Sequence, residues 1–168
     1  MFDDPALGAR RLSLRPAREE DTPFLRALFE TSRPDAAILA AWPEAVRGPF
    51  LDQQFHFQTI HYARMYPDAD RLVVVAGGSA IGRMIVSRQP AEWCLVDIAL
   101  LPDWRGQGCG TELVRTVQAA ACRARAACVR LTVDFQNPAR RLYQRLGFVT
   151  AEEGIPAVAM SWSTGAVN

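Results

Sequence analysis

A glycine-rich turn from Trp104 to Thr111 holds the residues whose types and spacing bear most directly on chemistry. It reads WRGQGCGT and lies between an apolar stretch and a segment with helical periodicity. Backbone N–H groups at a helix N-terminus lack intrahelical partners and face the positive end of the helix dipole. Gly106, Gly108 and Gly110 carry no side chain that would keep a ligand away from them. The turn therefore favours a phosphate or pyrophosphate ligand.

Two familiar phosphate-binding motifs do not fit this turn. The P-loop needs a GxxxxGK[ST] sequence, and the chain contains no lysine. A dinucleotide-binding GxGxxG would need glycine where Thr111 stands. The turn has to be interpreted from its context.

A second group of residues follows later, from Asn137 to Phe148. Asn137-Pro138 is typical of a helix cap followed by the first helical residue, and Gly147 ends the helix. Tyr143 shares a side of that helix with Leu142 and Leu146. A phenol with a pKa of about 10 can protonate a leaving group, and it can equally be a core tyrosine.

Two carboxylates, Glu92 and Asp97, lie on the apolar stretch before the turn. Regular strand alternation places Glu92, Cys94, Val96, Ile98 and Leu100 on one face and Asp97 on the other. Asp97 is flanked by apolar residues and is expected to be partly buried, where it would organise the turn or the substrate site.

The cysteines and histidines indicate no metal site. Four cysteines show no CxxC spacing, and the histidines, His56 and His61, have no cysteine-rich partner segment. We expect reduced thiols. Cys94 and Cys109 are alternative acyl acceptors, but neither has an adjacent base, and Cys109 is interpreted as a small apolar residue.

The periodicity predicts an α/β domain with a mixed sheet. Helices are expected around Phe24–Phe29, Phe50–Tyr66, Leu113–Ala124 and Pro138–Leu146, with a short one near Ala36–Ala41 inside a proline-interrupted loop, Ser32–Pro49. The expected strands are Arg11–Arg15, Arg71–Ala76, Ala80–Ser87, Glu92–Leu101, Cys128–Asp134, Phe148–Ala151 and Ala157–Ser163. Gly77-Gly78-Ser79 predicts a hairpin turn.

Length and composition limit the function classes. The 168 residues fit one domain, 1–168, and 49% hydrophobic with 22% charged residues is ordinary globular composition. A net charge of +1 indicates no nucleic-acid or membrane-surface partner. No apolar run is long enough to span a bilayer and the start does not resemble a signal peptide, so we expect a cytoplasmic protein.

The two motifs together resemble the GNAT superfamily of N-acetyltransferases. Arg105-Gly-Gln-Gly-Cys-Gly110 is similar to its acetyl-CoA pyrophosphate loop, R/Q-x-x-G-x-G/A, and the preceding DIALLPDW is similar to its central strand. The segment from Asn137 to Phe148 resembles the second signature, N-x-x-A-x-x-x-Y-x-x-x-G-F, with Arg140 where alanine is frequent. The specific part of the resemblance covers Glu92–Phe148.

The resemblance implies a GNAT fold: a mostly antiparallel sheet of six or seven strands flanked by helices, with a splayed central strand pair. It implies acetyl-CoA as cosubstrate, direct attack by a primary amine in a ternary complex, Tyr143 as the acid and Glu92 as the base. Implied cofactor-binding residues are the central-strand residues Ile98, Ala99, Leu100 and Leu101, the turn residues Arg105, Gly106, Gln107, Gly108, Cys109, Gly110 and Thr111, and also Asn137, Arg140 and Tyr143.

Other interpretations stay open. A non-catalytic acyl-CoA-binding or sensor domain would keep the same turn, and a nucleotide-binding regulator would use it for another phosphate. The acceptor is a small-molecule or peptide amine of unknown identity. Phe55, Phe57, His61 and Tyr62 are candidates for a substrate pocket, although such a stripe is more often core packing. The closing strands offer an edge for a homodimer.

Overall fold

The structure is a computed structural model that describes residues 12–166. Its centre is a seven-stranded sheet in the order β1-β2-β3-β4-β5-β7-β6. The strands are β1 (Leu12–Pro16), β2 (Asp70–Ala76), β3 (Ser79–Arg88), β4 (Glu92–Leu100), β5 (Cys128–Asp134), β6 (Val149–Glu152) and β7 (Ala157–Ser163). All neighbouring pairs are antiparallel except β4 and β5, which are parallel. The predicted mixed, mostly antiparallel sheet is confirmed. Arg11, expected to begin the first strand, lies outside the described residues.

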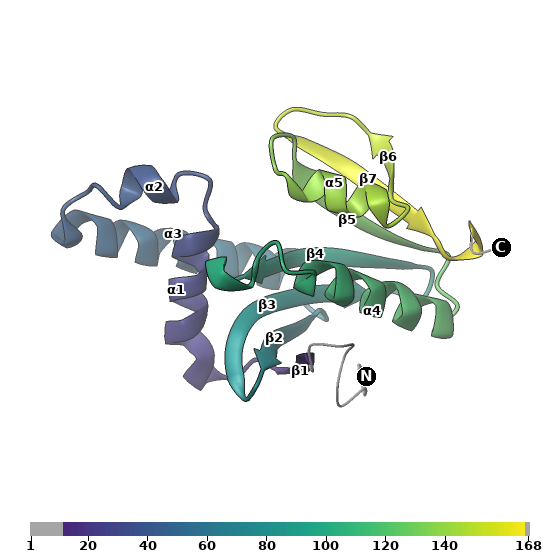
Figure 1. Ribbon diagram of the computed structural model, residues 1–168, viewed down its shortest axis with the longest axis horizontal. Coiled ribbons are helices and arrows are strands. Elements are labelled where there is room, and N and C mark those ends of the chain that lie inside the picture. Colours follow the sequence, from purple (N-terminus) through teal and green to yellow (C-terminus); the bar gives the residue numbers. More distant parts are fainter. Residues whose placement is uncertain (1–11, 167–168) are drawn as a thin grey trace.

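Five α-helices flank this sheet within the described residues: α1 (Thr22–Ser32), α2 (Ala36–Leu39), α3 (Glu44–Met65), α4 (Cys109–Arg123) and α5 (Ala139–Arg145). Short 3-10 turns occupy Glu19–Asp21, Pro102–Trp104 and Thr164–Ala166. In Figure 1, α4 and α5 lie in front of the strands, α1 and α2 lie at the left, and α3 runs from the left to behind the strands. Between residues 12 and 166, no helix combines the length and the apolar character that crossing a membrane requires.

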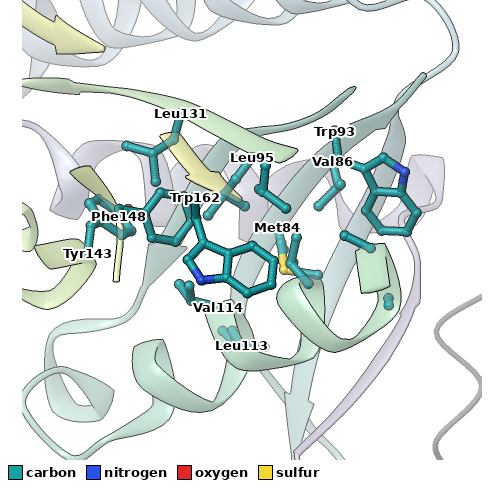
Figure 2. Packing of buried hydrophobic residues seen from close by; sticks show 14 of the residues in the cluster. Met84, Val86, Trp93, Leu95, Leu113, Val114, Leu131, Tyr143, Phe148 and Trp162 are labelled. Carbon is teal, nitrogen blue, oxygen red and sulfur yellow. The ribbon is translucent and has the colours of Figure 1, made fainter. Parts of the chain in front are cut away.

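One apolar core joins the sheet to α4 and α5. Apolar side chains alternate along β5, where Val129, Leu131 and Val133 are buried between more exposed neighbours. They meet the apolar side of α4, including Leu113 and Val114. Figure 2 shows Tyr143, Phe148 and Trp162 packed in this same core. The core fixes α4 and α5 against the two central strands, and so positions the turn at the start of α4.

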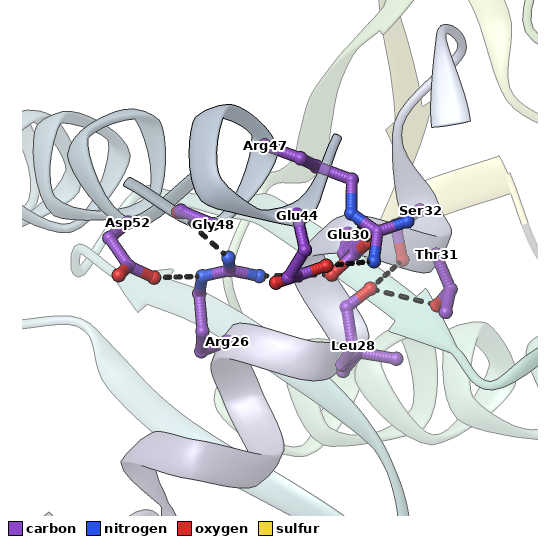
Figure 3. Close-up of polar contacts among 9 residues, drawn as sticks. All are labelled: Arg26, Leu28, Glu30, Thr31, Ser32, Glu44, Arg47, Gly48 and Asp52. Atoms are coloured by element: carbon purple, nitrogen blue, oxygen red, sulfur yellow. Dashed lines mark hydrogen bonds and ion pairs between the residues drawn. The ribbon is translucent and has the colours of Figure 1, made fainter. Parts of the chain in front are cut away.

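The long helix α3 begins six residues before the predicted Phe50, and the loop expected over Ser32–Pro49 is shorter than predicted. Pro49 lies in its second turn and removes only one backbone hydrogen bond there. Two ion pairs hold this first part of α3 to α1 (Figure 3): Arg26 contacts Asp52, with 2.7 Å between Nε and Oδ1, and Arg47 contacts Glu30. Arg47 also pairs with Glu44 within α3 itself. These contacts between segments distant in the sequence stabilise the helix across Pro49, the residue from which we predicted a loop.

β6 is an edge strand whose residues are all exposed. This edge is the one from which the homodimer was expected, and the homodimer stays a prediction.

Candidate functional site

The central strands β4 and β5 are paired along only part of their length. Their parallel ladder runs from Glu92, opposite Cys128, to Leu95, opposite Leu131, and stops there. Beyond it, β5 continues to pair with β7 through Asp134, and β4 continues to pair with β3 through Leu100. Figure 1 shows the two strands diverging from this paired end. The predicted splayed pair is present.

The divergence leaves peptide groups of β4 without a partner strand. They face the region between β4 and β5 beyond Leu95 and Leu131, which we call the split. Leu101 donates its N–H to Ile81 of β3 at 2.9 Å, so alternation along an antiparallel ladder turns the peptide groups of Ile98 and Leu100 away from β3. Ala99, opposite Arg83, faces β3 instead. Ile98 and Leu100 are therefore the residues of the expected set that can pair with an extended ligand in the split, as an added strand would.

The glycine-rich turn lies at the carboxyl end of β4 and presents unused donors. No acceptor among the described residues takes the backbone N–H groups of Gly106, Gly108, Cys109, Gly110 or Thr111. Gly106 and Gly108 have φ values of +68° and +89°, a left-handed conformation that side chains disfavour. Gly108 is the N-cap of α4 and accepts the first helical hydrogen bond, from Glu112 at 3.1 Å. These amides form a donor cluster at the positive end of α4, suited to an anion.

Tyr143 of α5 lies in the core on the α4 side of the sheet, with 5% of its surface exposed. Its ring packs on Phe148, with 5.8 Å between the ring centres. Its hydroxyl has no hydrogen-bond partner among the described residues. Burial first, and the negative charge of Asp97 second, raise the pKa of Tyr143 to about 12. The phenol therefore stays protonated at neutral pH, and it is close enough to Asp97 for their charges to interact.

A β-bulge at Val96 overturns the predicted alternation of β4. Ile85 of β3 pairs with Asp97 and Val86 pairs with Leu95, so Val96 has no partner on β3. Trp93, Leu95, Ile98 and Leu100 consequently pack on the α4-side core. Glu92, Cys94 and Asp97 share the opposite face, where we expected Asp97 to stand apart from the other two. Two-residue periodicity fails here because one extra residue is inserted.

Asp97 lies in a polar group that the sequence analysis only partly anticipated. Arg83 of β3 donates from Nε to Oδ2 of Asp97 at 2.7 Å and from Nη2 to Gln58 of α3 at 2.9 Å. Side-chain exposure is 11% for Arg83 and 19% for Asp97. Burial raises the pKa of Asp97 and the Arg83 charge opposes that rise. Arg83 and Gln58 were missed, although an arginine and an aspartate inside neighbouring apolar strands could have indicated a buried pair.

Glu92 lies at the opposite end of β4, where the strands are still paired. Its side chain is 44% exposed and its Oε2 lies 3.2 Å from Nε of Arg130. The structure brings Asp97, and not Glu92, within electrostatic reach of Tyr143.

Comparison with known families agrees with this geometry. The model of the acetyltransferase (GNAT) domain matches residues 67–150, half of the 168-residue chain. The chain belongs to the GNAT acetyltransferase family. The matched region contains β2 to β5, the glycine-rich turn and both central strands.

Solved structures share the fold of this GNAT acetyltransferase at low sequence identity. PaiA N-acetyltransferase from Thermoplasma acidophilum, solved in complex with coenzyme A, has a TM-score of 0.68 at 16% identity over 90% of this chain and 98% of its own. An acetyltransferase from Thermus thermophilus has a TM-score of 0.65 at 20% identity over 90% and 96%. The ribosomal-protein-S18-alanine N-acetyltransferase from Escherichia coli has a TM-score of 0.62 at 19% identity over 91% and 94%. The comparison with curated proteins gives no match.

Arg105 of the GNAT turn makes more hydrogen bonds within the protein than expected. Its N–H donates to Pro102 at 3.1 Å, so the cluster of unused amides begins at Gly106 rather than Arg105. Its guanidinium donates to the carbonyl of Leu100 at 2.8 Å and to that of Thr31 at 2.9 Å. Arg105 thus ties the turn to the end of α1. The Gln107 side chain also turns back, donating to the carbonyl of Asp103.

Residues at the start of α5 complete this side of the split. Asn137 accepts the N–H of Ala139 at its Oδ1, 2.9 Å away. The N-cap of α5 is Pro138, one residue later than the predicted cap at Asn137, because the helix begins at Ala139. The guanidinium of Arg140 lies over the Phe135 ring at 4.8 Å, and its buried Nε has no partner among the described residues. A Cβ on Gly110 would lie 3.3 Å from Leu142 of α5, so the turn and α5 are neighbours.

The remaining candidates separate into core and surface residues. Cys109 is fully buried in the apolar core, which fits its interpretation as a small apolar residue. Phe55 packs with the small cluster of Phe29, Leu39 and Leu51, whereas Phe57 is 55% exposed. Tyr62 lies beside Arg83, with 6.0 Å from its ring centre to the guanidinium carbon. Tyr62 is thus the member of the aromatic stripe that the structure places against the polar group at the split.

Proposed function

We propose that this GNAT acetyltransferase transfers the acetyl group of acetyl-CoA to a primary amine by direct attack in a ternary complex. The observation that carries the proposal is the early end of the β4–β5 ladder, next to a cluster of unpaired amides at the start of α4. Coenzyme A bound to the PaiA N-acetyltransferase supports the same cofactor here.

The helix dipole and the unused N–H groups of Gly106, Gly108, Cys109, Gly110 and Thr111 favour this turn as the pyrophosphate site, with Gln107 beside them. Ile98 and Leu100 would hydrogen-bond to the pantetheine arm, which puts the thioester between β4 and β5. Asn137 and Arg140 border this path, and Arg140 has an unpaired Nε to offer. The carbonyl of Leu100 is shared with Arg105, so the arginine side chain would border the pantetheine rather than the phosphates.

In the proposed step the amine nitrogen attacks the thioester carbonyl, a C–N bond forms, and the C–S bond breaks. The sulfur leaves with the electron pair of that bond and takes the proton of the Tyr143 hydroxyl. A pKa of about 12 supports this role, because it keeps the phenol protonated until the sulfur gains charge. No acyl-cysteine is needed.

The amine must also lose a proton, since its ordinary pKa of about 10.4 leaves it charged at neutral pH. The family resemblance implies Glu92 as the base, and the location of Asp97 beside Tyr143 supports Asp97. The pH–rate profiles of Glu92→Gln and Asp97→Asn separate the two. The base is the residue whose loss removes the acidic limb of the profile.

A pair of measurements tests the proposed function. Thermal shift with acetyl-CoA, NAD and ATP should show stabilisation by acetyl-CoA alone. Thiol release is then followed with alkylamines, amino-acid amides and short peptides as acceptors. Stabilisation by acetyl-CoA without thiol release from any of them would indicate a sensor domain instead, and no stabilisation would refute the cofactor assignment.

A further inference from the structure

Asp97 and Arg83 form an ion pair on the face of the sheet opposite Tyr143. Buried ion pairs cost desolvation free energy and add little to stability. One at a binding site is therefore better explained by the orientation that it gives to a charged group. The pair here is anchored from a third element, because Gln58 of α3 accepts from Nη2 of Arg83. Three elements, α3, β3 and β4, thus fix the orientation of a single carboxylate.

The hydrogen bonding of this carboxylate is one-sided. Both Nε and Nη2 of Arg83 lie 2.7 Å from the same oxygen, Oδ2. Oδ1 has no partner among the described residues, and the side chain retains 19% exposure. Asp97 follows the bulge directly, where β4 has parted from β5. A carboxylate oxygen in a largely desolvated place is therefore left without a hydrogen-bond donor, at the point of β4 where the split begins.

We infer that Oδ1 of Asp97 binds the ammonium group of the acceptor, on the α3 side of the split, and that Arg83 is the residue that positions it. This inference rests on the proposed function, since it names how the acceptor binds. The acceptor and the thioester then meet from opposite faces of the sheet, with Tyr143 on the side of the leaving sulfur.

The charges around Asp97 also define the class of acceptor. The groups that face it are Arg83 from β3, Tyr62 from α3 and Tyr143 from α5. None of these three supplies a second negative charge at neutral pH, and Arg83 repels a second cation. The site suits an amine with one positive charge, and it disfavours a polyamine.

The test follows the carboxyl carbon of Asp97 by 13C NMR in the CoA-loaded protein, as a function of pH, with and without butylammonium. Asp70 is the matched control, because it pairs with Arg88 of the same sheet, at 2.6 Å between Nε and Oδ2. Butylammonium should lower the pKa of Asp97, because a cation stabilises the carboxylate, and should not move the carboxyl signal of Asp70. 1,4-Diaminobutane should bind more weakly than butylammonium.

Variants of Arg83 separate positioning from folding. Arg83→Gln should raise the pKa of Asp97 further, because the cation that stabilises the carboxylate is gone. The protonated carboxyl no longer attracts an ammonium, so butylammonium binding at neutral pH should weaken roughly 10- to 100-fold, the range for one charge-assisted hydrogen bond to Oδ1. Arg83→Lys should recover part of that loss, and Arg88→Gln should change neither value. CoA binding, measured by calorimetry, reports separately on the fold and on the proposed function. A protein that binds CoA but whose Asp97 signal ignores butylammonium would overturn the inference alone.

Discussion

Replacing Tyr143 by phenylalanine should make the ligand-free protein more stable and the enzyme slower. The Tyr143 side chain is buried in the apolar core, yet its hydroxyl bonds to nothing among the described residues. Most buried hydroxyls have partners, and an unpartnered one costs free energy of folding. The substitution removes that oxygen and keeps the ring on Phe148.

The size of both effects follows from this geometry. An unpaired buried hydroxyl costs about 1 kcal/mol when it keeps slight access to water, so the free energy of unfolding should rise by about that amount. For a chain of this size that corresponds to a rise in Tm of about 3 °C. Loss of a positioned general acid should lower kcat by about 10² to 10⁴. Activity and stability should therefore change in opposite directions.

Urea unfolding and single-turnover thiol release measure the two quantities, and calorimetry checks that acetyl-CoA still binds. Tyr66→Phe is the matched control: its hydroxyl has a partner, since Cys94 lies 3.9 Å away as a weak donor, and it should not gain stability or lose activity. A destabilised Tyr143→Phe would mean that the hydroxyl is bonded after all. Full activity in that variant would refute the role as acid.

Two further predictions concern the sheet and its pH dependence. A Cβ at Gly82 of β3 would clash with the carbonyl oxygen of Ala99, so Gly82→Ala should displace β4. It should cost about 1–3 kcal/mol in urea unfolding and weaken acetyl-CoA binding in calorimetry. Gly78→Ala is the control: it should also cost stability, because Gly78 has φ of +84°, but it should leave binding unchanged, because its Cβ meets open space. Hydrogen bonds from Arg15 and then from the Arg18 N–H lower the pKa of Asp21 to about 2, so its stabilisation is complete above about pH 4 and is lost as pH falls towards 2. Asp21→Asn should accordingly be less stable than the parent at neutral pH, and unfolding curves should converge near pH 2; a difference that persists there would contradict this origin.

Local patterns in the sequence were sufficient for most of the elements. The alternation in β5, the Gly77-Gly78 hairpin and the glycine-rich turn before α4 each depend on neighbouring residues, and the structure has all three. The turn was interpretable because glycine at positive φ and unpaired helix amides are local properties. The start of α3 was not, because the contacts that hold it across Pro49 come from Arg26 and Glu30 of another helix.

The side chains around the reacting atoms depended on a feature that the sequence did not reveal. Val96 is an ordinary strand residue, and nothing local marks it as the extra residue of a bulge. Its insertion turns Ile98 and Leu100 into the core with Leu95, and turns Asp97 towards Arg83 and α3. The register with the bulge and the register without it place Asp97 against different neighbours. Without the bulge Asp97 would enter the apolar core, where an unpaired carboxylate is strongly disfavoured, whereas with the bulge it meets the buried guanidinium of Arg83 on the adjacent strand. The ion pair therefore favours the irregular strand, and the same irregularity brings a carboxylate to the split.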